Sequence, residues 1–381
     1  MVMIESEDQG MRLMEAVRNI AVVGLGKMGV SHLSIANATP GMKVVAICDT
    51  SAMIGGMIGK YTKLPFYPQY DDVLAVPDLD GVIIATPTRH HEAMIRRALA
   101  GKLHVFCEKP LTLSAATSTE LAQIASEQNL AAQVGYHNRF VGTFAEVKRL
   151  LDLGTIGKIR HVHADAYGPV VLKPAAKTWR SKPTEGGGCL YDYAAHPINL
   201  MNWYLGKPVF CTGAQLTKQW SEDVDDAIYS NLMFPGGVSG QVSVNWADET
   251  IRKMTTSLTL WGDGGKISVD RQEVRVYVGD KGKVSAGYRP KWTVRNITDL
   301  TPHPAFYLRG EEYSAQLEGF VSAMNDPATG YVNSFVSGAE TDHTLGMIRS
   351  AADGIREPVV PIAVAAVKRP KATMLARAFG Y

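Results

Sequence analysis

The chain between residues 19 and 136 alternates short, continuously apolar runs with longer segments in which apolar residues recur at helical spacing. The apolar runs occupy 19–24, 43–49, 80–87, 103–110 and 131–136. Continuous apolar character is typical of strands buried on both faces, as in a parallel sheet covered by helices. These repeated strand–helix–strand units predict a doubly wound α/β domain that ends near Tyr136.

Beyond Tyr136 the pattern changes to longer runs in which apolar and polar residues alternate. Such runs occupy 158–168, 227–234, 237–247 and 254–262, and turns rich in glycine and proline lie between them. Alternation is typical of antiparallel strands with one face open to solvent. Helical patterns follow at Glu311–Met324 and Gly338–Asp353. The sequence thus predicts two domains, 1–136 and 137–381, with an N-terminal extension over 1–18.

Composition narrows the classes of ligand and partner. The 381 residues suffice for two hydrophobic cores, and the net charge of +2 gives no broad attraction to nucleic acid or an anionic membrane. No apolar run reaches the roughly 20 residues of a membrane span, and the first residues are unlike a secretory signal. The four cysteines lie far apart without a CxxC pair, which indicates reduced thiols in a cytoplasm and no metal site.

A glycine motif, Gly24-Leu25-Gly26-Lys27-Met28-Gly29, follows the first apolar run and opens a helical pattern. Gly24 permits a tight turn, Gly26 lets the backbone approach a pyrophosphate, and Gly29 allows close helix packing. The amides of the helix N-terminus then face the phosphates. In this context the motif predicts a dinucleotide site, with Lys27 and Met28 also in contact with the cofactor.

Asp49 ends the second apolar run, at the position where a carboxylate accepts the adenosine ribose hydroxyls and repels a 2′-phosphate. This favours NAD. Thr50 and Ser51 follow it, and small hydroxyl residues there leave NADP possible.

Four further stretches carry a resemblance: ATPTRHHEA at 85–93, FCEKPL at 106–111, GYHNRF at 135–140 and GGGCLYDYAAHPIN at 186–199. In this order and spacing they resemble the glucose–fructose oxidoreductase / inositol dehydrogenase / MocA (Gfo/Idh/MocA) family. The resemblance implies a Rossmann domain followed by an α/β domain with a large, open, mainly antiparallel sheet that often forms the oligomer interface. It also implies interconversion of a secondary alcohol and a ketone on a sugar, cyclitol or nucleotide sugar.

By motif position, the resemblance gives Lys109 the role of the catalytic lysine and matches Asp192 and His196 to the family's conserved acid and histidine. The cofactor pocket is expected to include Thr86, Pro87, His91, Glu108 and Lys109. The chain departs from the common pattern at Thr88, Ala194 and Asn199, which leaves the exact substrate open.

The residue types suit alcohol oxidation. Hydride loss from a carbinol carbon requires a base for the hydroxyl proton, and His196 is the candidate. Asp192 precedes it by four residues, so it can orient the imidazole, bind the substrate, or both. Lys109 can stabilise negative charge on the reacting oxygen, with Glu108 beside it to position the ammonium. Pro197 predicts a kink at this point of the helix.

Taken singly, such a lysine or histidine is more often structural, but their occurrence together with the cofactor motif favours a functional role. Substrate contacts are expected from aromatic rings and planar or amide donors, which suit a sugar's faces and hydroxyls. They are Lys109, Tyr136, Arg139, Trp179, Arg180, Asp192, His196 and Asn199.

Other activities remain open: a ketosugar or imine reductase, or a non-catalytic regulatory protein that binds the cofactor. The presence of Lys109, Asp192 and His196 together argues against the regulatory protein. The partners expected are a polyol or sugar substrate and further copies of the chain, as a homodimer or homotetramer. The basic tail at 367–381 is either a solvated arm or a segment that docks on a neighbouring subunit.

Overall fold

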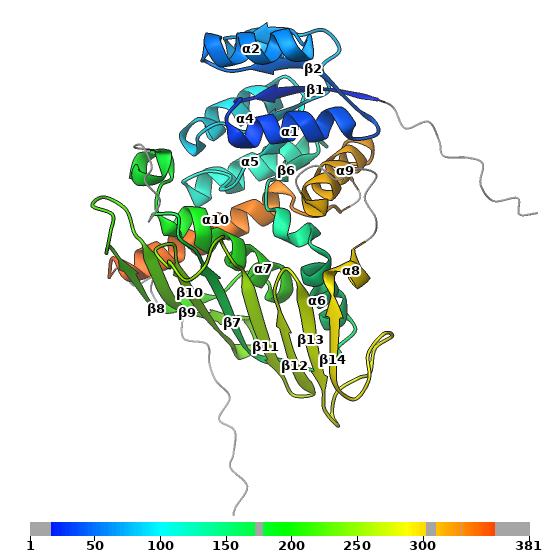
Figure 1. Cartoon of the computed structure of the whole chain (residues 1–381), viewed down its shortest axis with the longest axis vertical. Coiled ribbons are helices and arrows are strands. Elements are labelled where there is room, and N and C mark those ends of the chain that lie inside the picture. The colour runs from blue at the N-terminus through cyan, green and yellow to red at the C-terminus, as the bar shows by residue number, and fades with distance from the viewer. Residues whose placement is uncertain (1–16, 172–177, 302–309, 329, 355–381) are drawn as a thin grey trace, which may run out of the picture.

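A computed structural model describes residues 17–171, 178–301, 310–328 and 330–354. Two β-sheets lie at opposite ends of the molecule, with helices on and between them (Figure 1). The basic tail and all but the last two residues of the predicted N-terminal extension lie outside the described residues.

The first sheet has six parallel strands in the order β3-β2-β1-β4-β5-β6, which confirms the predicted doubly wound fold. All four residues of β4 are buried because helices cover both faces of the sheet. The strands are β1 (Arg18–Val23), β2 (Met42–Cys48), β3 (Phe66–Tyr67), β4 (Gly81–Ile84), β5 (His104–Cys107) and β6 (Ala132–Val134). The helices are α1 (Lys27–Ala38), α2 (Ala52–Thr62), α3 (Tyr70–Leu74), α4 (His91–Ala100) and α5 (Ala115–Glu127).

The second sheet has eight strands in the order β14-β13-β12-β11-β7-β10-β9-β8. Only the β10–β7 pair is parallel among these neighbours, so the sheet is mainly antiparallel, as the resemblance implied. The strands are β7 (Ile159–Tyr167), β8 (Phe210–Thr217), β9 (Ala227–Phe234), β10 (Val238–Asn245), β11 (Ser257–Gly262), β12 (Gly265–Val269), β13 (Glu273–Val278) and β14 (Lys291–Asn296).

One face of this second sheet is buried and the other is open. Alternate residues of β10 are buried, Val242 and Val244 among them, while the residues between them are partly or fully exposed. The buried face packs against helices that Figure 1 shows on the side of the first sheet. These are α6 (Gly142–Asp152), α7 (Ala195–Leu205) and α10 (Phe335–Ala352), and the short α8 (Ile297–Leu300) lies beside β14.

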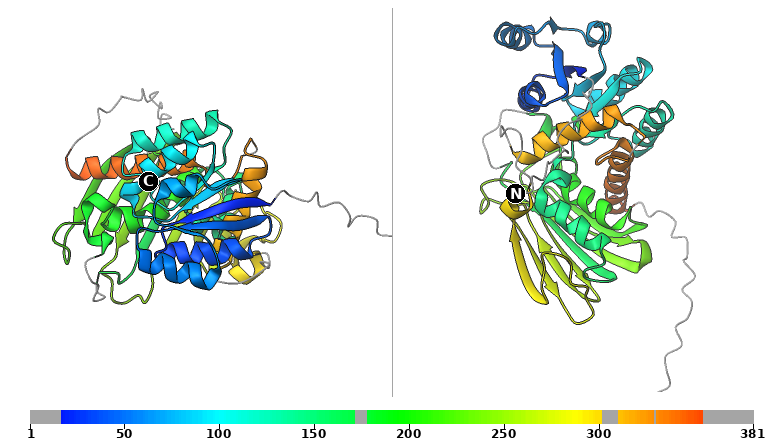
Figure 2. Two further views of the ribbon diagram at one scale, coloured as in Figure 1. Left: turned by 90° about the horizontal axis from the view of Figure 1, so that it is seen from above. Right: turned by 90° about the vertical axis from the view of Figure 1, so that its right-hand side faces the viewer.

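The last two described helices return to the first sheet (Figures 1 and 2). Helix α9 (Glu311–Asn325) places Phe320 against Phe106 of β5, with ring centroids 5.8 Å apart. Helix α10 packs against α5, and Ser334 just before it forms a bridge with Gln133 of β6. The cover of the first sheet therefore includes residues that the sequence assigned to the second domain, and the boundary at Tyr136 stays a prediction.

The described helices are all too short or too polar to cross a lipid bilayer. The four cysteines are free thiols, and three of them, Cys48, Cys107 and Cys189, are buried.

Candidate active site

Three adjacent strands of the first sheet end at the same edge, and each is followed by a predicted site motif. The glycine turn follows β1, Thr86 and Pro87 follow β4, and Glu108 and Lys109 follow β5. Ligands of open α/β sheets bind at this carboxyl edge. The fold thus brings together motifs that are distant in sequence, since 85 positions separate Gly24 from Lys109.

The glycine turn has the geometry that a dinucleotide requires. Gly24 has φ +87°, and a Cβ on Gly29 would lie 1.6 Å from the Gly24 carbonyl oxygen, so both positions need glycine. A Cβ on Gly26 would meet nothing within 4 Å, so the backbone is open there. Helix α1 starts at Lys27 without a side-chain cap and without an acidic residue in its first turn. Its free amides can therefore receive a pyrophosphate.

Asp49 lies beside this turn at the end of β2. Its Oδ2 accepts a hydrogen bond from the Leu25 amide at 2.7 Å, and its Oδ1 accepts one from the Ser51 amide at 2.8 Å. These bonds fix the carboxylate and leave further lone pairs for ribose hydroxyls, because an ionised carboxylate has about four acceptor sites.

His91 is buried behind the loops that follow β4 and β5. Its Nε2 lies 3.0 Å from the Thr86 carbonyl oxygen, and its Nδ1 lies 3.0 Å from the Pro110 carbonyl oxygen. His91 therefore ties the two loops together, and its place in the cofactor pocket stays a prediction.

The Lys109 ammonium forms a buried ion pair with Asp192. Its Nζ donates to Asp192 Oδ1 at 2.9 Å and to the Asp192 carbonyl oxygen at 2.8 Å. Arg180 Nε donates to the other carboxylate oxygen at 2.7 Å. Burial by itself raises the pKa of Asp192, but the charges and hydrogen bonds of Lys109 and Arg180 outweigh it and bring the pKa to about 2. Asp192 is therefore a permanent anion that holds Lys109 in place.

The run of glycines at 186–188 makes this arrangement possible. A Cβ on Gly187 would lie 2.4 Å from the Arg180 carbonyl oxygen, and one on Gly188, which has φ +106°, would lie 2.9 Å from Asp225 Oδ1. The absence of side chains lets the 3-10 turn at Trp179–Ser181 approach the segment that carries Asp192.

His196 is buried in the first turn of α7, beside the same ion pair. Its ring lies edge-on to Tyr136 and His137, with centroids 6.1 and 5.1 Å away. Burial, then the positive charges of Lys109 and Arg271, hold the pKa of His196 well below its usual value. The imidazole is therefore neutral near physiological pH, the form that a general base needs.

Of the two roles suggested for Asp192, orientation of the His196 imidazole does not occur in the structure, and contact with the substrate stays a prediction. Both Asp192 oxygens bond to Lys109 and Arg180, and His196 Nδ1 has no hydrogen-bond partner in the described part of the chain. The reason is local geometry: Asp192 lies in a π-helical turn (Leu190–Ala194) that precedes α7, so the i, i+4 spacing of an α-helix does not apply. This turn ends at Ala194, whereas Pro197 is the third residue of the regular helix α7, so the irregularity in the structure lies before the position at which the proline predicted a kink.

Glu108 does not position the Lys109 ammonium, contrary to expectation. Its Oε1 lies 2.7 Å from His32 Nε2, and its Oε2 accepts the Lys109 backbone amide at 3.2 Å. The carboxylate is thus directed toward helix α1, while Asp192 holds the ammonium.

The predicted substrate contacts divide into two groups. Tyr136, Trp179 and Arg180 lie around the ion pair and His196, with the Arg180 guanidinium 4.7 Å from the Trp179 ring centroid. Arg139 instead donates to Asn199 Oδ1 at 2.8 Å, and Asn199 donates to Thr341 of α10 at 3.0 Å. These buried bonds join α7 to its neighbours, and a substrate role for Arg139 and Asn199 stays a prediction.

Sequence reasoning missed His32, His137 and Arg271. The ring of His137 stacks on Tyr313, with centroids 4.7 Å apart, and Arg271 bonds to Glu312. Tyr313 and Glu312 both lie at the start of α9. His32 was recognisable as a polar residue on the buried face of α1. The other two depend on the return of α9, for which the sequence carries no local signal.

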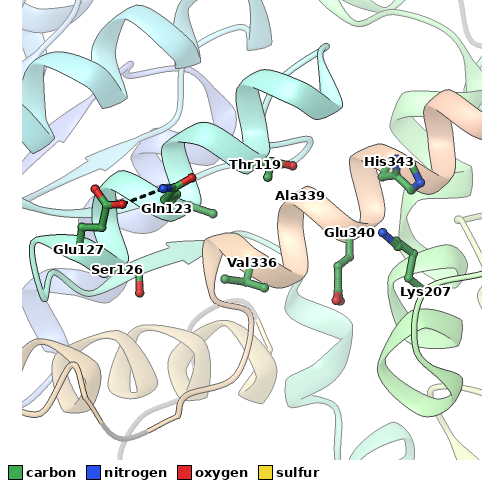
Figure 3. A pocket seen from close by; sticks show the side chains of 10 residues that line it. Thr119, Gln123, Ser126, Glu127, Lys207, Val336, Ala339, Glu340 and His343 are labelled. Carbon is green, nitrogen blue, oxygen red and sulfur yellow. Dashed lines mark hydrogen bonds between the residues drawn. The ribbon is translucent and has the colours of Figure 1, made fainter.

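A cavity of about 400 Å³ lies away from these residues, between α5, α10 and Lys207 (Figure 3). Thr119, Gln123, Glu127 and Glu340 line it, and none of the predicted site residues does.

Comparison with known families finds two matches. Residues 18–136 match the model "Oxidoreductase family, NAD-binding Rossmann fold" of GFO_IDH_MocA, and residues 144–268 match the GFO/IDH/MocA C-terminal domain.

Among curated proteins, scyllo-inositol 2-dehydrogenase (NAD(+)) of Bacillus subtilis (strain 168) is 30% identical over 61% of this chain and 68% of its own length. A 2,7-anhydro-N-acetylneuraminate hydratase of Escherichia coli (strain K12) is 25% identical over 67% of this chain and 68% of its own length. The chain spans between 54% and 68% of the first curated relatives it matches.

Among solved structures, levoglucosan dehydrogenase in complex with NADH and levoglucosan gives a TM-score of 0.78 at 21% identity, over 89% of this chain and 97% of that one. GenD2 from gentamicin A biosynthesis, in complex with NAD, gives a TM-score of 0.74 at 25% identity, over 92% of this chain and 97% of that one. These similarities confirm a Rossmann domain followed by a mainly antiparallel sheet domain.

Proposed function

The chain belongs to the Gfo/Idh/MocA oxidoreductase family, and we propose that it uses NAD to interconvert a secondary alcohol and a ketone on a sugar or cyclitol. One observation carries the proposal. The Lys109–Asp192 ion pair, with Nζ 2.9 Å from Oδ1, lies where the fold places the carboxyl edge of an NAD-binding sheet, and the neutral imidazole of His196 lies beside it.

The cofactor fits the residues of the first domain. Gly24, Gly26 and the N-terminus of α1 would hold the pyrophosphate, and Asp49 would hold the adenosine ribose. When bound, NAD accepts the hydride from the carbinol carbon.

Three side chains divide the remaining chemistry. His196 takes the hydroxyl proton as the carbonyl forms, because it is buried and uncharged. Lys109 stabilises the negative charge that develops on the reacting oxygen. Asp192 holds the ammonium in place and remains ionised, because its pKa is lowered to about 2.

The substrate class follows from what surrounds these groups. The Trp179 ring suits the apolar face of a sugar or cyclitol, and Arg180 and the buried Tyr136 hydroxyl suit its hydroxyl groups. A reductase that works mainly toward the alcohol or amine would use the same residues, so direction must be measured.

A second reaction class is raised by the relatives named as hydratases. Incubation with NAD and a panel of sugars, cyclitols, nucleotide sugars and anhydrosugars separates the two. Net NADH formation with a ketone product supports the dehydrogenase, whereas conversion of an anhydrosugar without net NADH would favour a hydratase and contradict the proposal.

The carboxylate of Asp49 predicts discrimination between NAD and NADP. We expect NAD to bind at least about tenfold more tightly than NADP, because a 2′-phosphate would face a fixed anion, and tenfold corresponds to about 1.4 kcal/mol. Titration of both cofactors measures the ratio.

Asp49→Ala should shift the ratio toward NADP, and Asp72→Ala, a control at an exposed acid in α3, should not. Tighter binding of NADP by the unaltered chain would refute this role.

The open face of the second sheet predicts an oligomer. It carries Tyr229, Trp261, Tyr277 and Trp292, and Trp292 has a relative exposure of 48%. Exposed aromatic residues on such a face are typical of interfaces. Light scattering at micromolar concentration should give a dimer or tetramer mass. Trp261→Glu should lower that mass, whereas Tyr61→Glu, on the exposed side of α2, should leave it unchanged. A monomeric mass for the unaltered chain would exclude the interface.

A further inference from the structure

A buried hydrogen bond joins the helix of the glycine turn to the loop of the catalytic lysine. His32 lies in α1, and its side chain is fully buried. Its Nε2 is 2.7 Å from Glu108 Oε1, across 76 residues of sequence. The other Glu108 oxygen accepts the Lys109 amide at 3.2 Å. His32 therefore reaches the backbone of Lys109 through one carboxylate.

The direction of the hydrogen bond between His32 and Glu108 follows from the chemistry of the two groups. A carboxylate only accepts, so His32 Nε2 must carry a proton and donate. His32 Nδ1 is buried and has no hydrogen-bond partner within the described residues, so a second proton there would be an unsatisfied donor. The bond therefore places a proton on Nε2, between the ring and the carboxylate.

Glu108 depends on this donor for its charge. Burial alone would raise the pKa of Glu108, but the hydrogen bond and the charge of His32, together with the nearby charge of Lys109, bring the pKa below its usual value. The backbone of Gly135 lies close to this carboxylate, since a Cβ at that position would lie 2.9 Å from Glu108 Oε2. Glu108 is therefore fixed, ionised and occupied on both oxygens.

We propose that His32 is a positioning residue for the reaction, which acts through Glu108 to set the place of Lys109 relative to the helix that binds the cofactor. This inference rests on the proposed function. Lys109 is held from two sides: Asp192 bonds its ammonium, and Glu108 bonds its backbone amide. The His32–Glu108 bond links this loop to α1 directly, so the glycine turn and the reacting end share one rigid connection.

Packing and positioning make different predictions for His32. The ring also contacts Phe106 edge-on, with centroids 5.0 Å apart. His32→Phe keeps a ring in this space and removes the donor. His32→Gln keeps an amide N–H that can reach the carboxylate, and His32→Asn carries the same amide one methylene shorter.

The test compares these variants with Glu108→Gln in steady-state oxidation of the substrate found in the panel, with NAD affinity and melting temperature measured alongside. His32→Phe and His32→Asn should lower kcat roughly tenfold to a hundredfold, the scale of a misplaced catalytic group, while NAD affinity changes by less than about threefold. His32→Gln should recover most of the activity.

The pH profile gives the sharper result. Without its donor, the pKa of Glu108 should rise, so kcat of His32→Phe should gain a limb that increases with pH as Glu108 ionises. Glu108→Gln cannot ionise and should show low activity without this limb. The double variant His32→Phe/Glu108→Gln should have a kcat no lower than that of Glu108→Gln alone, because the two residues act as one unit.

Unchanged kcat and pH profile in a folded His32→Asn or His32→Phe would overturn the proposal, as would a His32→Gln variant as impaired as His32→Asn. Carboxyl-carbon NMR of Glu108 in the unaltered protein and in His32→Asn measures the titration without turnover. If no panel compound is oxidised but the pKa of Glu108 rises in His32→Asn, the dehydrogenase assignment fails and the coupling stands; an unshifted pKa overturns the coupling.

Discussion

Replacement of Lys109 by methionine is expected to lower turnover in alcohol oxidation by about two to three orders of magnitude, the scale for loss of a preorganised electrostatic partner. Methionine keeps most of the length of the side chain and removes the ammonium that lies 2.9 Å from Asp192. NAD affinity should persist, because the glycine turn and Asp49 are unchanged. Steady-state kinetics and cofactor titration measure the two effects separately.

The matched control for this variant is Lys158→Met, which removes a charge at an exposed position before β7. It should have ordinary turnover. Near-normal turnover of Lys109→Met on the true substrate would show that the reacting oxygen does not depend on this cation.

The second large effect is expected at His196. His196→Asn should lower the rate by about two to four orders of magnitude, the scale of a lost general base. The sign of its pH dependence follows from the lowered pKa. A base with a lowered pKa stays unprotonated until the pH falls through that value, so the acidic limb of alcohol oxidation lies below the usual histidine range. His196→Asn should abolish this limb.

The charge of Lys109 should also affect the pH dependence that we assign to His196. Burial is the largest cause of the low pKa of His196, and the charge of Lys109 is the next. Removal of that charge should therefore move the acidic limb of Lys109→Met to higher pH. In the double variant Lys109→Met/His196→Asn, the two losses of turnover should combine less than additively. A limb that stays in place in Lys109→Met, or survives in His196→Asn, would assign the titration to another group.

Much of the architecture follows from the hydrophobic pattern. The continuous apolar runs became the buried strands β1, β2, β4, β5 and β6, and the helical patterns at Glu311–Met324 and Gly338–Asp353 became α9 and α10. These elements were predictable because burial on one or both faces leaves a periodic signal in the sequence itself.

The partners of individual side chains were less predictable. The four-residue spacing of Asp192 and His196 suggested contact on one helix face, but a π-helical turn separates them and Asp192 turns to Lys109 and Arg180. Glu108 follows the strand that leads to Lys109, yet it pairs with His32 of α1. Such choices depend on which segments the tertiary fold brings together, and neighbours in sequence do not reveal them.

The most direct test of the account is to follow the hydride. With the substrate from the panel carrying deuterium at its carbinol carbon, mass spectrometry of the cofactor should show one deuterium transferred to NAD for each ketone formed. His196→Asn and Lys109→Met should form this product slowly and in the same ratio. Ketone formation without labelled cofactor, or substrate conversion with no oxidation at that carbon, would contradict the assignment of this chain as a dehydrogenase that uses Lys109, Asp192 and His196.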